Sequence, residues 1–502
     1  MSEKQSRVVA VGPMPPEKSA YALARYSRSP DSIRQSLDWV QTHDSQKFLE
    51  SFYFQYGHAS IADLGHVVLC FEGISELVAI EVEDEPLWDG QARSSRYQDF
   101  SRSGFVTPPG LDAEQTRLYE DTANQLLAAY KDIHSRIVAH LSERLPKPGE
   151  MKPDAYQRNI SARAFDVARY LLFWGIRTGV GQVTSIRTLE RQIRRLKASE
   201  YEEARLLAGE IAEACANQPE CFLDRATRPE PVAPTLARHV DADMHVMQSR
   251  EDLRQWASQN LPPARGYELT KRGCAPDWGQ KDAAAFRCRT AEESGIVDLL
   301  IPTSTSADIV ATLLYPVTDR PYRELYELAS DWSAAMRTEV LDTAVRSRTQ
   351  RDELLRGFRG GPYVFDIVMD LGAYRDMHRH RRCQQFRQSF GTTLGFDTPE
   401  AITEAGLTVP YKAAIQTAFS ATGALPEPAS HYLLPFATRS RFLFKMDFAE
   451  AEYIARQRSG VKGHFSYRRV AWEMKRKMEE VEPELGRLIH ATPPWVEDPL
   501  KR

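Results

Sequence analysis

The chain has 502 residues and is therefore long enough for more than one domain. Of these residues 42% are hydrophobic and 27% are charged, a composition that excludes a largely disordered protein. Lysine and arginine number 65 and aspartate and glutamate 69, a net charge of −4 that argues against a general nucleic-acid-binding protein. No apolar run approaches the ~20 residues of a membrane helix, and the N-terminus lacks a signal-peptide pattern, so we predict a cytoplasmic protein.

The six cysteines form no CxxC pair, and their spacing fits neither a zinc site nor a disulfide framework. We therefore expect reduced thiols and no bound metal. Cys383 follows a run of basic residues, where neighbouring cations can lower the pKa of a thiol. A thiolate nucleophile is one interpretation of Cys383, and a small packing residue is the favoured one.

The N-terminal part of the chain divides into a predicted arm and a first folded unit. Residues 1–30 are polar and contain several prolines, which is typical of an arm. Residues 31–216 form the first predicted unit. It contains an apolar strand pattern at 66–73 and a long helical periodicity at 118–145.

A proline-rich stretch follows residue 216, and a second break comes after a short helical pattern at 244–261. We predict a linker with short helices over 217–287. The second unit, 288–502, has a helical periodicity at 322–340 and an apolar strand pattern at 363–372.

Two stretches of the chain have similar patterns. Residues 162–196 and 429–460 both begin with small residues, continue through a Leu-Leu step and end in an arginine-bearing helix pattern. We interpret the similarity as a weak internal duplication, and two unrelated α+β domains are the alternative. The Gly-rich stretch at 179–184 lacks the third glycine of a phosphate loop and follows no predicted strand, so we do not assign it a phosphate.

The most unusual segment is 375–382, which holds four arginines and two histidines in eight residues directly after a predicted strand. Cations this dense repel one another unless an anion neutralises them. A phosphate or a flavin pyrophosphate would do so through charge-assisted hydrogen bonds. A solvated basic turn and an RNA-facing patch remain open as alternatives.

Within this segment, Arg379-His380-Arg381 is followed after seven residues by Ser389. The pattern resembles the signature of the flavin-dependent thymidylate synthases. Other parts of that signature resemble segments of the first unit, namely His58-Ala59-Ser60 with Asp63 in place of a Glu, and Ser94-Ser95-Arg96-Tyr97.

Each half lacks what the other keeps. The first unit has Asp84, Glu85 and Pro86 where the triplet would stand, and the second has Gly391 in place of the arginine of the S-x-R-Y stretch. The resemblance implies an α+β fold of two tandem copies, each a sheet flanked by long helices. It also implies a homodimer that forms a pseudo-tetramer with sites shared between units.

The resemblance further implies methylation of C5 of dUMP to give dTMP, with methylenetetrahydrofolate as carbon donor, FAD as cofactor and NADPH as reductant. It suggests three sets of residues: flavin-binding His58, Ser60, Arg187, Arg379, His380 and Arg381; substrate-binding Ser94, Arg96, Tyr97, Arg205 and Arg468; and catalytic Arg379, His380, Arg381, Ser389 and Arg468. Arginine suits such a site because its fixed charge stabilises negative charge on a pyrimidine edge.

Other interpretations remain. A helical arginine such as Arg205 or Arg468 is more commonly part of a surface ion pair. The protein could alkylate or hydroxymethylate another pyrimidine nucleotide, or bind a flavin or nucleotide without catalysis. A nucleic-acid-binding module built on 375–382 is the third alternative, and we expect neither nucleic acid nor membrane as a partner.

Overall fold

The computed structural model describes residues 14–27, 29, 32–51, 59–217, 230–236, 240–262, 296–349, 355–359, 361–481, 483–486, 489–498 and 500. Their contacts define two compact units: unit 1 comprises 1–72, 81–92 and 179–243, and unit 2 comprises 73–80, 93–178 and 244–502. The units therefore interleave along the chain, whereas the sequence predicts consecutive segments.

Unit 1 combines short N-terminal helices with a three-stranded sheet. Strands β1 (His66–Ser75), β2 (Asp89–Ala92) and β3 (Arg177–Ser185) have the order β1-β3-β2, and β2 pairs antiparallel with β3. The strand predicted at 66–73 is confirmed, and the Gly-rich stretch at 179–184 lies inside β3.

Two groups of helices belong to unit 1, one before its strands in the sequence and one after them. Helix α1 (Pro16–Tyr26) falls in the predicted arm and contacts α2 (Ile33–Gln41), α3 (Ser45–Leu49) and the 3₁₀ helix η2 (Ala59–Leu64). It buries Ala20, Ala22 and Ala24. Near the end of unit 1, α7 (Ile186–Lys197) contacts α8 (Glu202–Ala216).

Unit 2 contains a four-stranded antiparallel sheet with the order β4-β5-β7-β6. Its strands are β4 (Val297–Leu300), β5 (Tyr363–Asp370), β6 (Gln384–Arg387) and β7 (Arg439–Met446). The strand predicted at 363–372 is confirmed as β5. Because β5 is buried along almost its whole length, both faces of the sheet must be covered.

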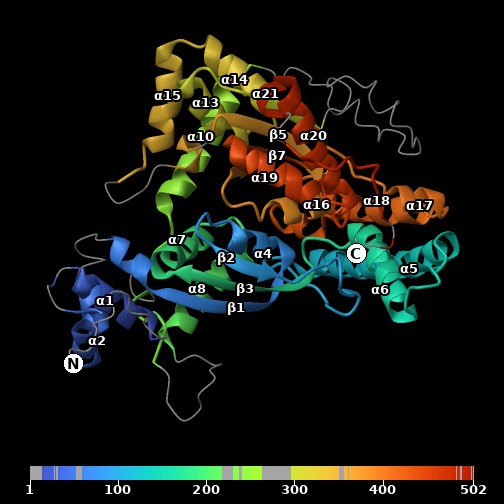
Figure 1. The fold of residues 1–502 in the computed structure, drawn as a ribbon. Helices are drawn as coiled ribbons and strands as arrows, with labels where there is room; N and C mark the ends of the chain where they lie inside the picture. Colours follow the sequence, from blue (N-terminus) through green and yellow to red (C-terminus); the bar gives the residue numbers. More distant parts are fainter. Residues whose placement is uncertain are drawn as a thin grey trace. The chain divides into compact units, whose positions relative to one another are not determined.

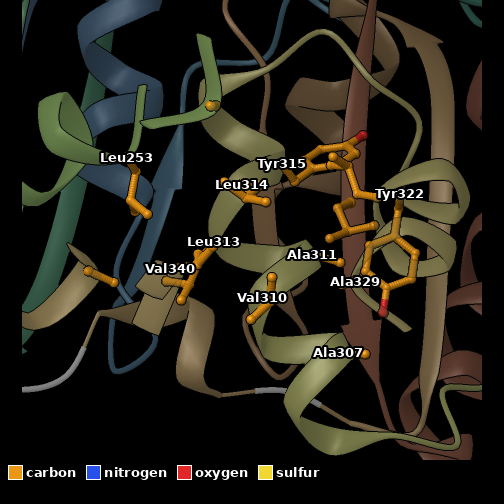
Figure 2. Close-up of a cluster of buried hydrophobic side chains, with 14 of the residues drawn as sticks. Leu253, Ala307, Val310, Ala311, Leu313, Leu314, Tyr315, Tyr322, Ala329 and Val340 are labelled. Carbon is orange, nitrogen blue, oxygen red and sulfur yellow. The ribbon is translucent and has the colours of Figure 1, made fainter. Parts of the chain in front are cut away.

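One face of this sheet packs against a helical core (Figure 2). The core joins α10 (Met244–Asn260), α13 (Thr305–Leu314), α14 (Tyr322–Asp331) and α15 (Ala334–Val345) to Val364 of β5 and Leu443 of β7. The helical pattern predicted near 244–261 is confirmed. The periodicity at 322–340 is divided between two helices, because Ser333 caps α15 by accepting the N–H of Met336 at 3.3 Å.

The other described helices of the chain complete the fold (Figure 1). Helix α5 packs against α6 and α18, and α19 packs against α20, which also contacts β4 and β5. Their bounds are α4 Glu76–Glu83, α5 Ala113–Arg144, α6 Pro153–Ala168, α16 Leu371–Met377, α17 Glu400–Glu404, α18 Thr408–Ala424, α19 Phe448–Ser459, α20 Phe465–Val481 and α21 Pro483–Gly486, with 3₁₀ helices η3 Arg169–Leu171, η5 Tyr315–Val317, η6 Arg356–Phe358 and η7 Ala429–Leu433.

Two strand-to-helix junctions have matching geometry. At the β1–α4 junction, the N–H of Val78 donates to Ser75 Oγ at 3.1 Å. At the β5–α16 junction, the N–H of Ala373 donates to Asp370 Oδ1 at 2.8 Å. Each side chain therefore satisfies an N–H of the first helical turn, so Ser75 and Asp370 have the same local role as helix caps.

Two loops of unit 2 pair with each other antiparallel. Trp174 and Gly175 donate their N–H groups to the carbonyls of Leu434 and Tyr432, at 3.1 and 2.7 Å. In return, the N–H groups of Phe436 and Ala437 donate to the carbonyls of Leu172 and Tyr170, at 2.7 and 3.1 Å. Each loop gives two hydrogen bonds and receives two, which is the pattern of a local twofold relationship.

Candidate functional site

The turn that carries the Arg-His-Arg triplet follows α16, and its middle side chain is directed into the protein while its two arginines are more accessible. His380 is buried, with 5% of its surface exposed, whereas Arg379 is exposed and Arg381 half-buried. The carbonyl of His380 accepts hydrogen bonds from Gln385 Nε2 at 2.8 Å and Cys383 Sγ at 3.0 Å. The turn is therefore held from inside at its middle residue.

The imidazole of His380 lies between two side chains of α19. Arg458 Nε donates to Nε2 at 2.7 Å, and Glu450 Oε1 lies 3.5 Å from Nδ1. Burial lowers the pKa of His380, and the charges of Arg458 and Arg379 add to this against the opposing effect of Glu450. The ring is therefore neutral over most of the physiological range.

Arg96, from the S-x-R-Y stretch, is also buried. Its guanidinium donates to Asp166 from Nε at 2.7 Å and from Nη2 at 3.2 Å, to the Tyr467 hydroxyl at 2.9 Å and to the carbonyl of Lys462 at 3.0 Å. Four of its five N–H groups are thus used within the protein. Burial opposes the charge of Arg96, but Asp166 outweighs it and raises the pKa.

Arg375 of α16 ties this stretch to the triplet helix. Its Nη1 donates to Ser95 Oγ at 2.7 Å and its Nη2 to the carbonyl of Arg93 at 3.1 Å. Nη2 also lies 2.7 Å from Glu76 Oε1, although burial still raises the pKa of Glu76. Structural motifs from the two halves of the sequence therefore meet in unit 2.

Asp376, next along α16, lies in the field of four arginines. Arg169, which is fully buried, donates from Nη2 to Asp376 Oδ2 at 3.1 Å. Burial would raise the pKa of Asp376, but Arg169, Arg96, Arg458 and Arg375 together lower it. We call these four residues the arginine cluster.

Tyr467 of α20 connects two members of the arginine cluster. Its hydroxyl accepts from Arg96, and the guanidinium carbon of Arg458 lies 5.6 Å from its ring centroid, within the range of a cation–π contact. Because Arg458 also donates to His380, Tyr467 links the S-x-R-Y stretch to the triplet.

The remaining predicted residues of unit 2 differ in accessibility. Ser389 is exposed, as is Tyr97 at 55%. Ser94 Oγ accepts the N–H of Arg96 at 3.3 Å. Arg468 is only 2% exposed and donates to the carbonyls of Ser459, Pro493 and Val496 at 2.9, 3.1 and 2.7 Å. These three carbonyls take up the Nε–H and both Nη2 N–H groups of the guanidinium.

Three of the predicted residues in the described part of the chain belong to unit 1. Ser60 is exposed in η2. Arg187 Nη1 donates to Asp63 Oδ2 at 3.0 Å, and Arg205 Nη1 donates to the carbonyls of Ser199 and Glu200 at 2.8 and 3.0 Å, before α8. His58 lies outside the described residues.

Unit 1 carries an acidic turn after α4. Asp84 lies nine residues after the cap Ser75, as Arg379 lies nine residues after the cap Asp370. Glu85, 7% exposed, accepts from Arg195 Nε at 2.8 Å. An arginine from the last turn of a helix therefore contacts the middle residue of each turn, here a carboxylate and in unit 2 an imidazole.

Sequence reasoning missed the carboxylates that pair with the arginine cluster. Glu76 and Asp166 each stand in a mostly apolar stretch, and an acidic residue in such a stretch indicates a buried ion pair, because an unpaired charge there is very costly. Asp376 lies inside the basic segment 375–382, directly after Arg375. For Cys383, burial raises the pKa to about 12, which favours a packing role over a nucleophile.

The described residues bear on two other classes of function, metal binding and membrane insertion. No group of three or more histidine, cysteine, aspartate or glutamate side chains there could hold a metal ion. Among the helices in the same part of the chain, none is long and apolar enough to cross a bilayer. The side chain of Arg375 is only 10% exposed and lies beside Glu76, so 375–382 does not form one continuous exposed basic patch for RNA.

Comparison with known proteins gives a match over both halves of the chain. Residues 10–218 and 327–484 match the family described as thymidylate synthase complementing protein. Similar proteins include one from Chlamydia muridarum, 25% identical over 85% of this chain and 77% of its own length. Another, from Thermoplasma acidophilum, is 23% identical over 93% of both chains. Both carry only the name UPF0159 protein.

Proposed function

Because this chain belongs to the thymidylate synthase complementing protein family, we propose that it methylates C5 of a deoxyuridine nucleotide, dUMP to dTMP, with methylenetetrahydrofolate and a flavin. The observation that carries the proposal is the tie made by Arg375. It holds Ser95 and the carbonyl of Arg93 beside the helix that leads into Arg379–Arg381. The two surviving parts of the signature are thereby adjacent.

Three other observations support a fused pair of subunits. The β1–α4 and β5–α16 junctions have matching caps, the loops at 170–175 and 432–437 exchange reciprocal hydrogen bonds, and the family match falls in two segments. We infer that each half is a copy of one ancestral subunit. Two chains would then assemble as a homodimer with the organisation of a tetramer.

The turn at 379–381 fits the anionic part of FAD. It presents the exposed Arg379 and the half-buried Arg381 on a backbone that is fixed at His380. Fixed cations bind phosphate oxygens through charge-assisted hydrogen bonds. In the proposal these arginines hold the flavin pyrophosphate. The family resemblance also assigns His58, Ser60 and Arg187 to flavin binding.

The flavin, when bound and reduced by NADPH, would supply the hydride chemistry. The protein's own groups bind and orient the nucleotide and exclude water. Ser94, Arg96 and Tyr97 would contact the nucleotide phosphate. Arg468 or Arg205 would contact the pyrimidine edge, and Ser389 would take part in catalysis.

The proposal is tested with the purified full chain, first by titration with FAD and then by product analysis after incubation with dUMP, methylenetetrahydrofolate and NADPH. We expect bound FAD and formation of dTMP. Protein that neither contains nor takes up FAD would contradict the proposal. Arg381→Ala should weaken FAD binding without changing the fold, and Arg382→Ala, which alters an exposed neighbouring arginine, is the matched control.

A second candidate is binding of a flavin or nucleotide without methylation. It is favoured by the contacts of Arg96 and Arg468, which use most of their donors inside the protein. FAD binding without any dTMP would support it. A methylated or hydroxymethylated product from another uridine nucleotide, but not from dUMP, would instead identify a related pyrimidine-modifying enzyme.

A further inference from the structure

His380 is the buried member of an otherwise accessible turn, and its two ring nitrogens have defined neighbours. Arg458 donates to Nε2 at 2.7 Å. A guanidinium has only donors and stays charged, so Nε2 must be the unprotonated acceptor. The ring proton of the neutral imidazole is then on Nδ1, where it faces Glu450 Oε1 at 3.5 Å.

This arrangement leaves no nitrogen of His380 for a ligand. Nε2 is occupied by Arg458, Nδ1 faces Glu450, the edge of the ring contacts Tyr453, and only 5% of the residue is exposed. A general acid or base must reach the proton that it transfers. His380 therefore does not act on substrate through its ring in this conformation.

We propose that Glu450 and Arg458 are positioning residues that fix His380 in its Nδ1-protonated neutral form, so that Arg379 and Arg381 are held in place to bind an anionic ligand. The identity of that ligand as FAD rests on the proposed function. The protonation state of His380 does not, because it follows from the contacts with Arg458 and Glu450 alone.

The contacts of the backbone support a positioning role. The carbonyl of His380 accepts from Gln385 and Cys383, and its N–H donates to the carbonyl of Met377 at 3.2 Å. Side chain and main chain are therefore both restrained at this residue. A ligand that binds Arg379 and Arg381 pays less entropy for ordering them on a fixed turn than on a mobile one.

The acidic turn of unit 1 shows what a different middle residue does. Glu85 also receives a hydrogen bond from a helix arginine, Arg195, but it brings a negative charge of its own. Neutral His380 accepts the same kind of hydrogen bond without adding a negative charge beside Arg379 and Arg381. The choice of histidine thus keeps the turn cationic while the arginine of α19 remains satisfied.

The first experiment measures the ring directly, by ¹⁵N NMR of the full chain labelled in histidine, with His380→Gln used to assign the signal. We expect Nδ1 to be protonated and Nε2 to be unprotonated, and this state to persist below the ordinary pKa of histidine. Protonation on Nε2, or titration at the ordinary pKa, would overturn the proposal whether or not FAD binds.

The second experiment measures FAD affinity in three variants. Glu450→Leu removes the acceptor for Nδ1–H and should weaken binding about tenfold, equivalent to ~1.4 kcal/mol. Glu450→Gln keeps an acceptor oxygen and should restore most of the affinity. Glu452→Gln alters another acidic residue of the same helix, α19, and should bind like the unmodified protein.

The outcomes of the two experiments are separable. Equal FAD affinity in Glu450→Leu and the unmodified protein would overturn the positioning role. If the unmodified protein binds no FAD, the proposed function fails and the NMR result alone decides on His380.

If Glu450→Leu does not fold, two measurements still test the proposal, namely the comparison of FAD affinity between Glu450→Gln and Glu452→Gln and the NMR measurement of the ring. An unchanged tautomer in Glu450→Gln supports the proposal, and an Nε2-protonated ring overturns it.

Discussion

The turns at 84–86 and 379–381 begin at equivalent points after a strand, a side-chain cap and a short helix, yet they carry opposite charge. In unit 1, Glu85 accepts from Arg195 and follows another acid, Asp84. In unit 2, His380 accepts from Arg458 between two arginines. Both turns therefore have a helix arginine bound to their middle residue, whereas the charge of the turn differs between the two units.

The difference separates structural from ligand-binding requirements. A carboxylate that pairs with Arg195 satisfies a half-buried cation but makes the turn unsuitable for an anionic ligand. A neutral imidazole satisfies Arg458 and leaves the positive field of Arg379 and Arg381 in place. Only the turn of unit 2 can therefore contribute cations to a flavin or nucleotide site.

The strongest way to break the comparison is to transfer the acidic turn. In the variant Arg379→Asp/His380→Glu/Arg381→Pro, we expect FAD affinity to fall by at least ~100-fold, because hydrogen bonds from charged donors contribute roughly 1.5–3 kcal/mol each. Fluorescence titration with FAD measures the change. The triple variant Asp84→Arg/Glu85→His/Pro86→Arg is the reciprocal control, and equal loss in both variants would show that the two turns are not distinct in function.

Removal of each helix arginine should sharpen the comparison through stability. Arg195→Met removes the hydrogen bond that the buried carboxylate of Glu85 accepts and should cost about 3 kcal/mol of unfolding free energy. Arg458→Met leaves a neutral imidazole and should cost about 1 kcal/mol. Urea denaturation of both variants provides the measurement. A larger loss in Arg458→Met than in Arg195→Met would contradict the neutral state of His380.

The smallest expected effect is on the pH dependence of stability. Burial and the neighbouring Arg458 and Arg379 lower the pKa of His380 in the folded chain, against the opposing Glu450, so the unfolded chain binds the proton more readily. The contribution of His380 is complete above the unfolded pKa, about 6.5, and is lost as the pH falls through the window down to the lowered folded pKa.

This prediction is measured as the change in urea midpoint between pH 7.5 and pH 5.5. The decrease should be greater in the unmodified protein than in His380→Gln, which keeps an acceptor but does not titrate. Other acids, such as Asp370, titrate in both proteins and cancel in the comparison. An identical decrease in the two proteins would mean that His380 is protonated equally easily in the folded and unfolded chain.

The sequence was sufficient to predict strands β1 and β5, because each is a short apolar run that ends in a polar cap. It was not sufficient for β7, which lies within a stretch of helical character at 429–460. The arginine at its start and the aromatic residues that follow form a strand only because β5 and β6 pair with it on both sides. Such partners lie far away in the chain, and local periodicity does not report them.

In the candidate site, too, some features could be predicted from the local sequence and others could not. The basic residues at 375–382 stand out in the sequence, but nothing local indicates that His380 and Arg375 are buried while Arg379 is exposed. Which of these side chains is buried depends on residues distant in sequence. Glu450 and Arg458 of α19, which contact His380, lie at least 70 positions from it, and Glu76 of α4 lies about 300 positions from its partner Arg375. Long-range ion pairs determine it, and they become visible only in three dimensions.

The reciprocal hydrogen bonds between the loops at 170–175 and 432–437 have an evolutionary consequence. In an assembly of identical subunits, every substitution appears simultaneously at each symmetry-related position, so a change that harms one position harms all. In the proposed fused pair of subunits, the two halves are covalently joined, so each position mutates on its own. An acidic turn can then arise in one half while selection retains the basic turn in the other.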